Sequence, residues 1–263
     1  IDVDFSVKHN EIVGLVGSNG AGKSTLMKMI AGNFPPTKGE MWFDGEKVRL
    51  HSPHQARDLG IEIVYQDLAL CENLDIAGNF FLGREITKGS FYFLQEKEMR
   101  KTAFEALKKI GITTLNLSNI TKKEQFLSGG QRQAIAVGKA SSWGAKLILL
   151  DEPTSALGLR ESQNVLNLIR QIREERGSSI VVVSHNLQHV LPVSDRIVVL
   201  QHGKKIYDFN PKNVSYKKIV EMISEVDSIK MDIVKTKKEQ ILIQKRFTFM
   251  QNLFRWQNYL VKN

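Results

Sequence analysis

A glycine-rich segment directly after a short apolar run narrows the folds open to this chain. Residues Ile12–Val16 are apolar or glycine, and Gly17–Thr25 then reads GSNGAGKST, which matches G-x-x-x-x-G-K-[ST]. The apolar run predicts a buried strand, and Lys23–Ala31 followed by Gly32 predicts a helix with a glycine at its C-terminal end. A strand, a glycine-rich turn and a helix in this order predict a phosphate-binding loop (P-loop), with a chance glycine-rich turn as the alternative.

The residue types of this loop suit a phosphate chain. Glycines let successive backbone N–H groups point inward, and the start of the following helix adds its positive dipole end. Lys23 has the reach for the β- and γ-phosphates, and the Ser24 hydroxyl is a ligand for Mg²⁺. The candidate nucleotide contacts here are Gly17, Ser18, Asn19, Gly20, Ala21, Gly22, Lys23, Ser24 and Thr25.

Two acidic residues follow a second apolar strand. Leu147–Leu150 leads into Asp151, Glu152 and Pro153. Because ligands of open α/β sheets lie beyond the carboxyl ends of the strands, Asp151 is placed to hold Mg²⁺ through its water shell. Glu152 is placed to act as the general base on the attacking water. The alternative is an ordinary solvated acidic turn at the end of a strand.

The remaining pattern predicts α/β organisation with a helical insertion. Strand-like runs are absent from about Asp67 to Gly144, where helical stretches dominate, and then they return. Strand–helix–strand alternation predicts parallel βαβ units. Other predicted strands are Met41–Asp44, Lys47–Leu50, Ile61–Tyr65, Ile180–Val183 and Ile197–Leu200, and the predicted helices include 53–60, Glu96–Ile110, Gly130–Ser141 and Glu161–Arg176.

A second glycine-rich helix start names the family that this sequence resembles. Leu127–Gln131 reads LSGGQ (the signature) and opens a predicted helix. With this motif the sequence resembles the ABC transporter ATPases over about residues 1–210. The resemblance implies an α/β P-loop NTPase (RecA-like) core with a mixed sheet, an antiparallel β flank and an inserted α-helical subdomain.

The resemblance also implies roles for further residues. Gln66, in VYQ, corresponds to the Q-loop glutamine, and Ser155–Leu157 begins the D-loop. His185, in VSH, corresponds to the switch histidine; the alternative is a surface histidine at a strand end. Two copies of such a chain enclose two ATP molecules, so that the signature acts on ATP held by the partner. The implied sites are catalytic Glu152, His185 and Gln66; nucleotide-binding Ser128, Gly129, Gly130 and Gln131; and metal-binding Ser24, Gln66 and Asp151.

Two stretches resemble simple-sugar importers of the ribose, xylose and fructose type. They are Phe81–Glu85, FLGRE, and Ala156–Gly158, followed by Arg160 and Glu161. The implied protein uses ATP and Mg²⁺, forms a homodimer, and binds transmembrane permease subunits at the cytoplasmic face of the inner membrane. It serves a solute-binding protein indirectly and powers uptake of a monosaccharide. Gly158 departs from the usual D-loop aspartate. The P-loop starts too near the N-terminus for the segment in which the family carries an adenine-stacking aromatic residue, and a start without Met suggests that the native N-terminus is missing.

We expect three regions. Residues 1–66 and 145–212 would form the ATPase core lobe, and 67–144 the helical signature subdomain. Residues 213–263 would form a basic amphipathic tail that carries +5 of the net charge of +9. Such a tail is typical of a helix packed on the domain or left loose, or of a helix on an acidic membrane surface; a frameshifted end is a third reading.

Composition limits the function classes. No apolar run approaches the roughly 20 residues that span a bilayer, the acidic start does not resemble a signal peptide, and the lone Cys71 excludes an internal disulfide. Most of the excess charge lies in the tail, so no nucleic-acid partner is expected. The alternatives are a non-transport ABC ATPase acting on nucleic acid or ribosomes, and a non-hydrolysing regulatory subunit. Lys23, Asp151, Glu152 and His185 argue against the second.

Overall fold

The computed structural model describes residues 2–89, 92–109, 112, 120, 121, 123, 127–214, 217–219, 221 and 222. The chain divides by its internal contacts into two units, Ile1–Asn213 and Val214–Asn263. Nearly all of the second unit, and with it the predicted amphipathic tail, lies outside the described residues. No helix in the described ranges is long and apolar enough to cross a bilayer.

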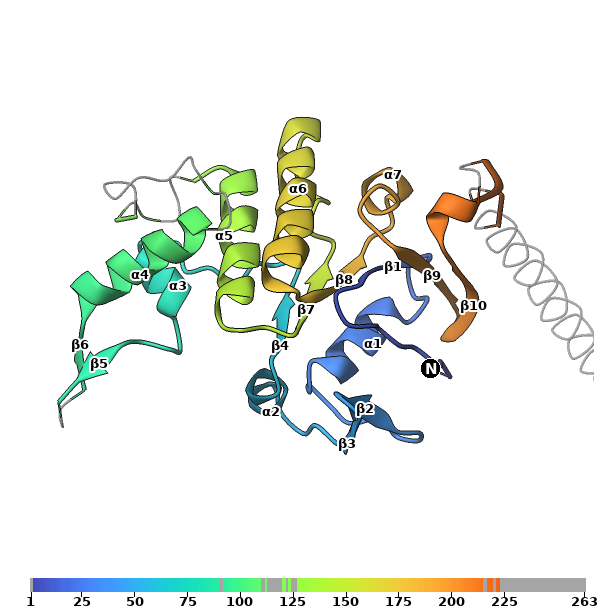
Figure 1. Cartoon of the computed structure of the whole chain (residues 1–263), viewed down its shortest axis with the longest axis horizontal. Helices are drawn as coiled ribbons and strands as arrows, with labels where there is room; N and C mark the ends of the chain where they lie inside the picture. The colour runs from blue at the N-terminus through green and yellow to red at the C-terminus, as the bar shows by residue number, and fades with distance from the viewer. Residues whose placement is uncertain are drawn as a thin grey trace, which may run out of the picture. The chain divides into compact units, whose positions relative to one another are not determined.

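A mixed sheet forms the centre of the first unit. Within the described residues it has six strands in the order β10-β9-β1-β8-β7-β4 (Figure 1). All neighbours are parallel except β9 and β10, which form an antiparallel pair. The strands are β1 Ile12–Val16, β4 Ile61–Val64, β7 Leu147–Asp151, β8 Ser179–Val183, β9 Arg196–Gln201 and β10 Lys204–Phe209.

Helices cover both faces of this sheet. Alternate residues of the strands, such as Leu15 and Leu149, pack with Leu26 and Met27 of α1 in one buried cluster. In Figure 1, α1 and α2 lie on one side of the sheet and α5 and α6 on the other. The helices are α1 Lys23–Ile30, α2 Pro53–Asp58, α3 Ile76–Phe81, α4 Glu96–Lys109, α5 Gly129–Ser142, α6 Leu159–Arg176 and α7 Leu187–Val190, with the 3₁₀ turn Pro211–Asn213.

Short antiparallel hairpins accompany the main sheet. The predicted pair near residue 45 is present as β2, Met41–Phe43, and β3, Glu46–Val48. A second hairpin, β5 Thr87–Lys88 with β6 Phe93–Leu94, interrupts the segment in which the sequence predicted no strands. That expectation was wrong because strands of two residues are too short to show the alternation that identifies a strand.

In the described part of the stretch between β4 and β7 the longer elements are helices, as the sequence predicted. Helices α3, α4 and α5 pack on one another in this stretch. Phe80 and Phe81 at the end of α3 are buried against the Trp143 ring, with ring centroids 5.5 and 5.3 Å from it. This aromatic cluster joins α3 to the end of α5, so the helix that begins at the signature is anchored at its far end.

Candidate nucleotide-binding site

Four parallel strands bring the predicted site residues to one edge of the sheet. β1, β8, β7 and β4 are consecutive neighbours and run in the same direction. Each strand ends within two residues of a residue predicted for the site. β1, β8, β7 and β4 are followed by Gly17, His185, Glu152 and Gln66, respectively. Residues far apart in the sequence therefore meet at the carboxyl edge, where open α/β sheets bind ligands.

The P-loop has a backbone that glycine makes possible. Gly17, Gly20 and Gly22 have φ values of 152°, 79° and 103°. A Cβ on Gly17 would lie 2.2 Å from the Leu200 carbonyl oxygen, so this residue has no room for a side chain. A Cβ at Gly20 would meet no atom within 4 Å. The loop is therefore packed tightly at its start and open at its tip.

The first turn of α1 offers free backbone donors. Its N-cap residue is Gly22, and within the described ranges no side chain caps the helix there. The N–H groups of a first helical turn have no partner within the helix and attract anions. Ser24 and Thr25 of this turn are exposed, as are Asn19 and Gly20 of the loop. An uncapped helix start beside an open glycine turn fits the phosphate chain of ATP.

The Lys23 side chain is folded back over the same loop. Its amino group donates hydrogen bonds to the carbonyl oxygens of Gly17, at 2.6 Å, and Ser18, at 3.1 Å. Burial lowers the pKa of Lys23, although Glu152 and Asp151 oppose this shift. The charge is thus held at the loop by weak carbonyl partners, which an anionic ligand would outcompete.

The two acidic residues after β7 have different surroundings. Burial, with the charge of Glu152, raises the pKa of Asp151, and Lys23 and Lys28 oppose the shift. The Ser24 hydroxyl and the Asp151 carboxylate are oxygen ligands of the kind that Mg²⁺ prefers, and a cation would offset the burial of Asp151. These residues therefore fit a magnesium ion.

Glu152 and His185 form a direct pair. The Glu152 carboxylate lies 2.9 Å from His185 Nδ1 and accepts a hydrogen bond of 3.0 Å from the His185 backbone N–H. A hydroxyl hydrogen bond from Ser184, at 3.3 Å, reaches the other carboxylate oxygen. Glu152 is mostly buried while the His185 ring is mostly exposed. The structure thus brings together two residues that separate motifs nominated.

The signature also begins a helix, α5, but side chains cap this helix, unlike α1. The Ser128 hydroxyl accepts from the Gln131 N–H at 3.2 Å, and the Gln131 side chain accepts from the Ser128 N–H at 3.0 Å. A Cβ on Gly130 would lie 3.0 Å from Glu161 side-chain atoms, and one on Gly129 3.4 Å from Leu157. Both contacted residues lie in or next to the D-loop at the start of α6, so the signature and the D-loop form one surface.

Gln66 is exposed and lies two residues beyond β4. The strand that carries it is tied to the helical stretch, because Arg84 forms an ion pair with Glu62 of β4 and stacks over the Trp143 ring at 5.2 Å. The sequence did not nominate Ser184 or the pair of Thr154 and His189, whose Oγ1 and Nδ1 atoms are 2.9 Å apart. Ser184 is detectable as the polar residue between an apolar strand and His185; the Thr154–His189 pair has no local signal.

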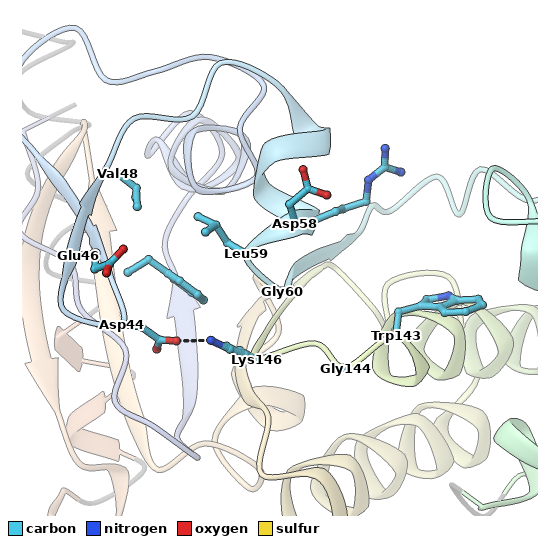
Figure 2. Close-up of a pocket in the computed structure, with 11 residues that line it drawn as sticks. Asp44, Glu46, Val48, Asp58, Leu59, Gly60, Trp143, Gly144 and Lys146 are labelled. Carbon is cyan, nitrogen blue, oxygen red and sulfur yellow. Dashed lines mark hydrogen bonds and ion pairs between the residues drawn. The ribbon is translucent and has the colours of Figure 1, made fainter.

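A separate cavity of about 440 Å³ lies between the β2–β3 hairpin, the end of α2 and the turn before β7. In Figure 2 Asp44 and Lys146 face each other there, and the Lys146 amino group donates to the Asp44 carboxylate at 2.5 Å. Its lining carries charges of both signs and none of the predicted site residues. We therefore assign the candidate site to the carboxyl edge of the sheet.

Comparison with known proteins shows which family the chain belongs to. The profile of the family described as "ABC transporter" matches residues 1–155. The fructose import ATP-binding protein FrcA of Rhizobium meliloti is 44% identical over 215 residues, which are 80% of this chain and 82% of that protein. The xylose/arabinose import ATP-binding protein XylG of Sulfolobus acidocaldarius is 41% identical over 222 residues, 84% of this chain and 86% of that protein.

A solved structure of an ATP-binding cassette supports the same family assignment. A dimeric ATP-binding cassette in a post-hydrolysis state, bound to ADP and Pi, has a TM-score of 0.65 and 28% identity, and the match covers 80% of this chain and 89% of that one. The match of more than half of the chain to the family profile, together with two relatives above 40% identity, shows that this chain belongs to the ABC transporter family, in its ATP-binding subunits.

Proposed function

We propose that this chain hydrolyses ATP to drive uptake of a monosaccharide through a membrane permease. The observation that carries the proposal is the contact of Glu152 with His185 at the sheet edge that also bears the P-loop. The choice of cargo is supported by two relatives named for import of fructose and of xylose or arabinose. Because both of these relatives are named as import proteins, the alternative of an ATPase acting on nucleic acid or ribosomes has no support.

The residues divide the work of hydrolysis. The P-loop amides and Lys23 hold the phosphate chain, and Glu152 takes the proton of the attacking water. The Glu152 oxygen that faces His185 already accepts from the His185 N–H, whereas the other oxygen accepts, among the described residues, only the long bond from Ser184. The second oxygen is therefore the better acceptor for the proton. Ser24, Asp151 and Gln66 would hold Mg²⁺, which neutralises phosphate charge when bound.

A second copy completes each site. Ser128, Gly129, Gly130 and Gln131 would contact ATP that is held by the partner's P-loop. Support comes from their position on the surface shared with the D-loop and from the dimeric form of the similar cassette. Closure of the dimer would assemble the site and hydrolysis would release it.

This second copy can be tested by mixing two inactive chains. One chain carries Lys23→Ala, and the other carries Ser128→Arg, whose long side chain would obstruct the partner's nucleotide. A mixed dimer regains one intact site from the unaltered halves, so equal amounts should recover about a quarter of the wild-type rate. No recovery, while both variants still form dimers, would contradict assembly of the site from two copies.

The subunit would act at the cytoplasmic face of the membrane, bound to permease subunits that a solute-binding protein supplies with sugar. Within it, residues 1–66 and 145–212 form the core lobe and 67–144 the helical signature subdomain. Reconstitution with the permease and an uptake panel of pentoses and hexoses, with amino acids as controls, tests the cargo. Uptake of an amino acid and of no sugar would overturn the sugar assignment and leave the ATPase assignment standing.

The catalytic assignment has its own experiment. Glu152→Gln keeps the shape of the side chain and removes the base, so turnover of MgATP should fall at least about a hundredfold. ATP-driven dimerisation, measured by size-exclusion chromatography, should persist because the P-loop and signature are unchanged. Turnover of the variant at the wild-type rate would show that Glu152 is not the base.

A further inference from the structure

A circuit of polar contacts joins the loop after β7 to the loop after β8, behind the Glu152–His185 pair. Ser184 Oγ donates to Glu152 at 3.3 Å and accepts from the Asn186 N–H at 3.0 Å. Asn186 Nδ2 lies 3.5 Å from His189 Nε2, and His189 Nδ1 lies 2.9 Å from Thr154 Oγ1. Thr154 is two residues after Glu152, so the chain itself closes the circuit.

The partners of the circuit fix where its protons lie. Asn186 Oδ1 accepts from the Gln188 N–H at 3.0 Å, which sets the orientation of the amide and turns Nδ2 toward His189. An amide nitrogen only donates, so His189 Nε2 must accept. In this arrangement Nδ1 is the ring nitrogen that donates to Thr154 Oγ1. His189 thereby bridges one acceptor and one donor.

The circuit holds a backbone that is strained. Glu152 has a φ of 52°, in the left-handed region that residues other than glycine rarely adopt. Such a conformation persists where the surrounding structure holds it. The Glu152 N–H is fixed by the Val183 carbonyl at 2.9 Å. Two residues on, the Thr154 side chain is 3% exposed and pairs with His189.

We infer that His189 is a positioning residue for hydrolysis. Through Thr154 it holds the loop that carries Glu152, and through Asn186 it holds the loop that carries His185. It touches neither Glu152 nor His185 in the contacts described, and it acts on where the Glu152 carboxylate lies. This inference rests on the proposed role of Glu152 as the base.

The test separates positioning from nucleotide binding. In the full-length chain, His189→Ala should lower kcat for MgATP about tenfold and leave KM within about twofold, since the P-loop is untouched. His189→Gln offers one donor and one acceptor in place of the two ring nitrogens, so it should return kcat to within about threefold of wild type. The matched control is Gln188→Ala, because this exposed side chain lies on the same short helix and its backbone N–H remains; its kcat should equal the wild-type value.

Thr154 provides a second route to the same contact. Thr154→Val removes the hydroxyl and keeps the volume, so it should also lower kcat about tenfold, whether or not His189→Ala folds. Thr154→Ser should restore it. Because the two residues act as a pair, the double variant should be no slower than the slower single variant. A wild-type kcat in His189→Ala or Thr154→Val, or losses that multiply in the double variant, would overturn the inference.

Glu152→Gln, assayed alongside, tells the two proposals apart. If it is inactive and His189→Ala and Thr154→Val turn over at the wild-type rate, the positioning role fails and the proposed function stands. If Glu152→Gln turns over at the wild-type rate, the proposed base fails, and the positioning role fails with it.

Discussion

Two clusters of charged side chains lie at opposite ends of the central strands, and their pKa shifts point in opposite directions. At the amino end of β1, Arg196 donates to Glu11 at 2.8 Å and to Asp208 at 2.9 Å. Burial works to raise the pKa values of Glu11 and Asp208, but hydrogen bonds from Arg196 hold both below their ordinary values. Hydrogen bonding to Glu11 in turn raises the pKa of Arg196. Each charge in this cluster is stabilised by its partners.

At the carboxyl end of the strands, burial disfavours the charged forms of Lys23 and Asp151. Burial lowers the pKa of Lys23 and raises that of Asp151, and the attraction between the two does not reverse either shift. Lys23 relies on carbonyl partners, and a carboxylate neighbour, Glu152, adds to the shift of Asp151. The first cluster is complete within the chain and serves the fold. The second cluster would be completed by an anion at Lys23 and a cation at Asp151. A nucleotide with bound magnesium supplies both.

The largest effect that separates the two ends is expected for Lys23→Ala. Loss of the cation from the phosphate site should lower turnover at least about a thousandfold and remove most ATP affinity. The free energy of unfolding should stay within about 1 kcal/mol of wild type, because a disfavoured buried charge has been removed. ATPase assays, nucleotide binding and urea unfolding measure the three quantities. Lys28→Ala, on the exposed side of the same helix, is the control and should retain activity.

Arg196→Met should lower stability and leave turnover nearly unchanged, which is the reverse of the effect expected for Lys23→Ala. It leaves Glu11 without its ion-pair partner and Asp208 with Lys205 alone, which should lower the free energy of unfolding by about 3 kcal/mol. At temperatures where the variant is folded, kcat should be close to wild type, because the site lies at the other end of the strands. Urea unfolding and ATPase activity are measured on the same preparation. A large loss of kcat in the folded variant would mean that the two ends are coupled.

Ligand binding should stabilise only the chain with an intact carboxyl end. With Glu152→Gln, which prevents turnover, MgATP at about 100 times its Kd should raise the free energy of unfolding by about 2.7 kcal/mol. ATP with EDTA should give less, because Asp151 then lacks its cation. Adding Lys23→Ala should remove the effect. Equal stabilisation with and without Mg²⁺ would show that the metal does not contribute to binding.

The sequence predicted the residues at the carboxyl end of the strands better than those at the amino end, because the former belong to short contiguous motifs. The P-loop and the acidic pair are contiguous motifs, each attached to an apolar strand, and β1 and β7 are found where predicted. The pairing of Glu152 with His185 depends on β7 and β8 being neighbours, which the parallel arrangement allowed but did not fix. The roles of Gln66 and of the signature stay predictions.

The strand and the residue pairs that the sequence did not predict have little or no local sequence pattern. The edge strand β10, Lys204–Phe209, is mostly exposed, so it lacks the apolar run that identified its neighbours. Arg196 and Glu11 are separated by most of the domain and meet through the pairing of β1 with β9. Thr154 and His189 likewise meet through tertiary structure. Residues that hold a site in place were harder to find than residues that contact the ligand.

The smallest expected effect is a pH dependence of the amino-end cluster. Glu11 and Asp208 have folded pKa values below their ordinary values of 4.5 and 3.8, so they bind protons more readily when the chain is unfolded. Their contribution is therefore complete above these ordinary values and is lost as the pH falls through the lower folded values. Between pH 5 and pH 3 this loss should be about 1–2 kcal/mol in wild type and smaller in Arg196→Met, where Asp208 keeps its contact with Lys205. Urea unfolding of both chains at each pH measures the difference, in which the shifts of other carboxyl groups cancel. Parallel pH curves would mean that Arg196 does not set the two pKa values, and the contrast between the two ends would then rest on the carboxyl end alone.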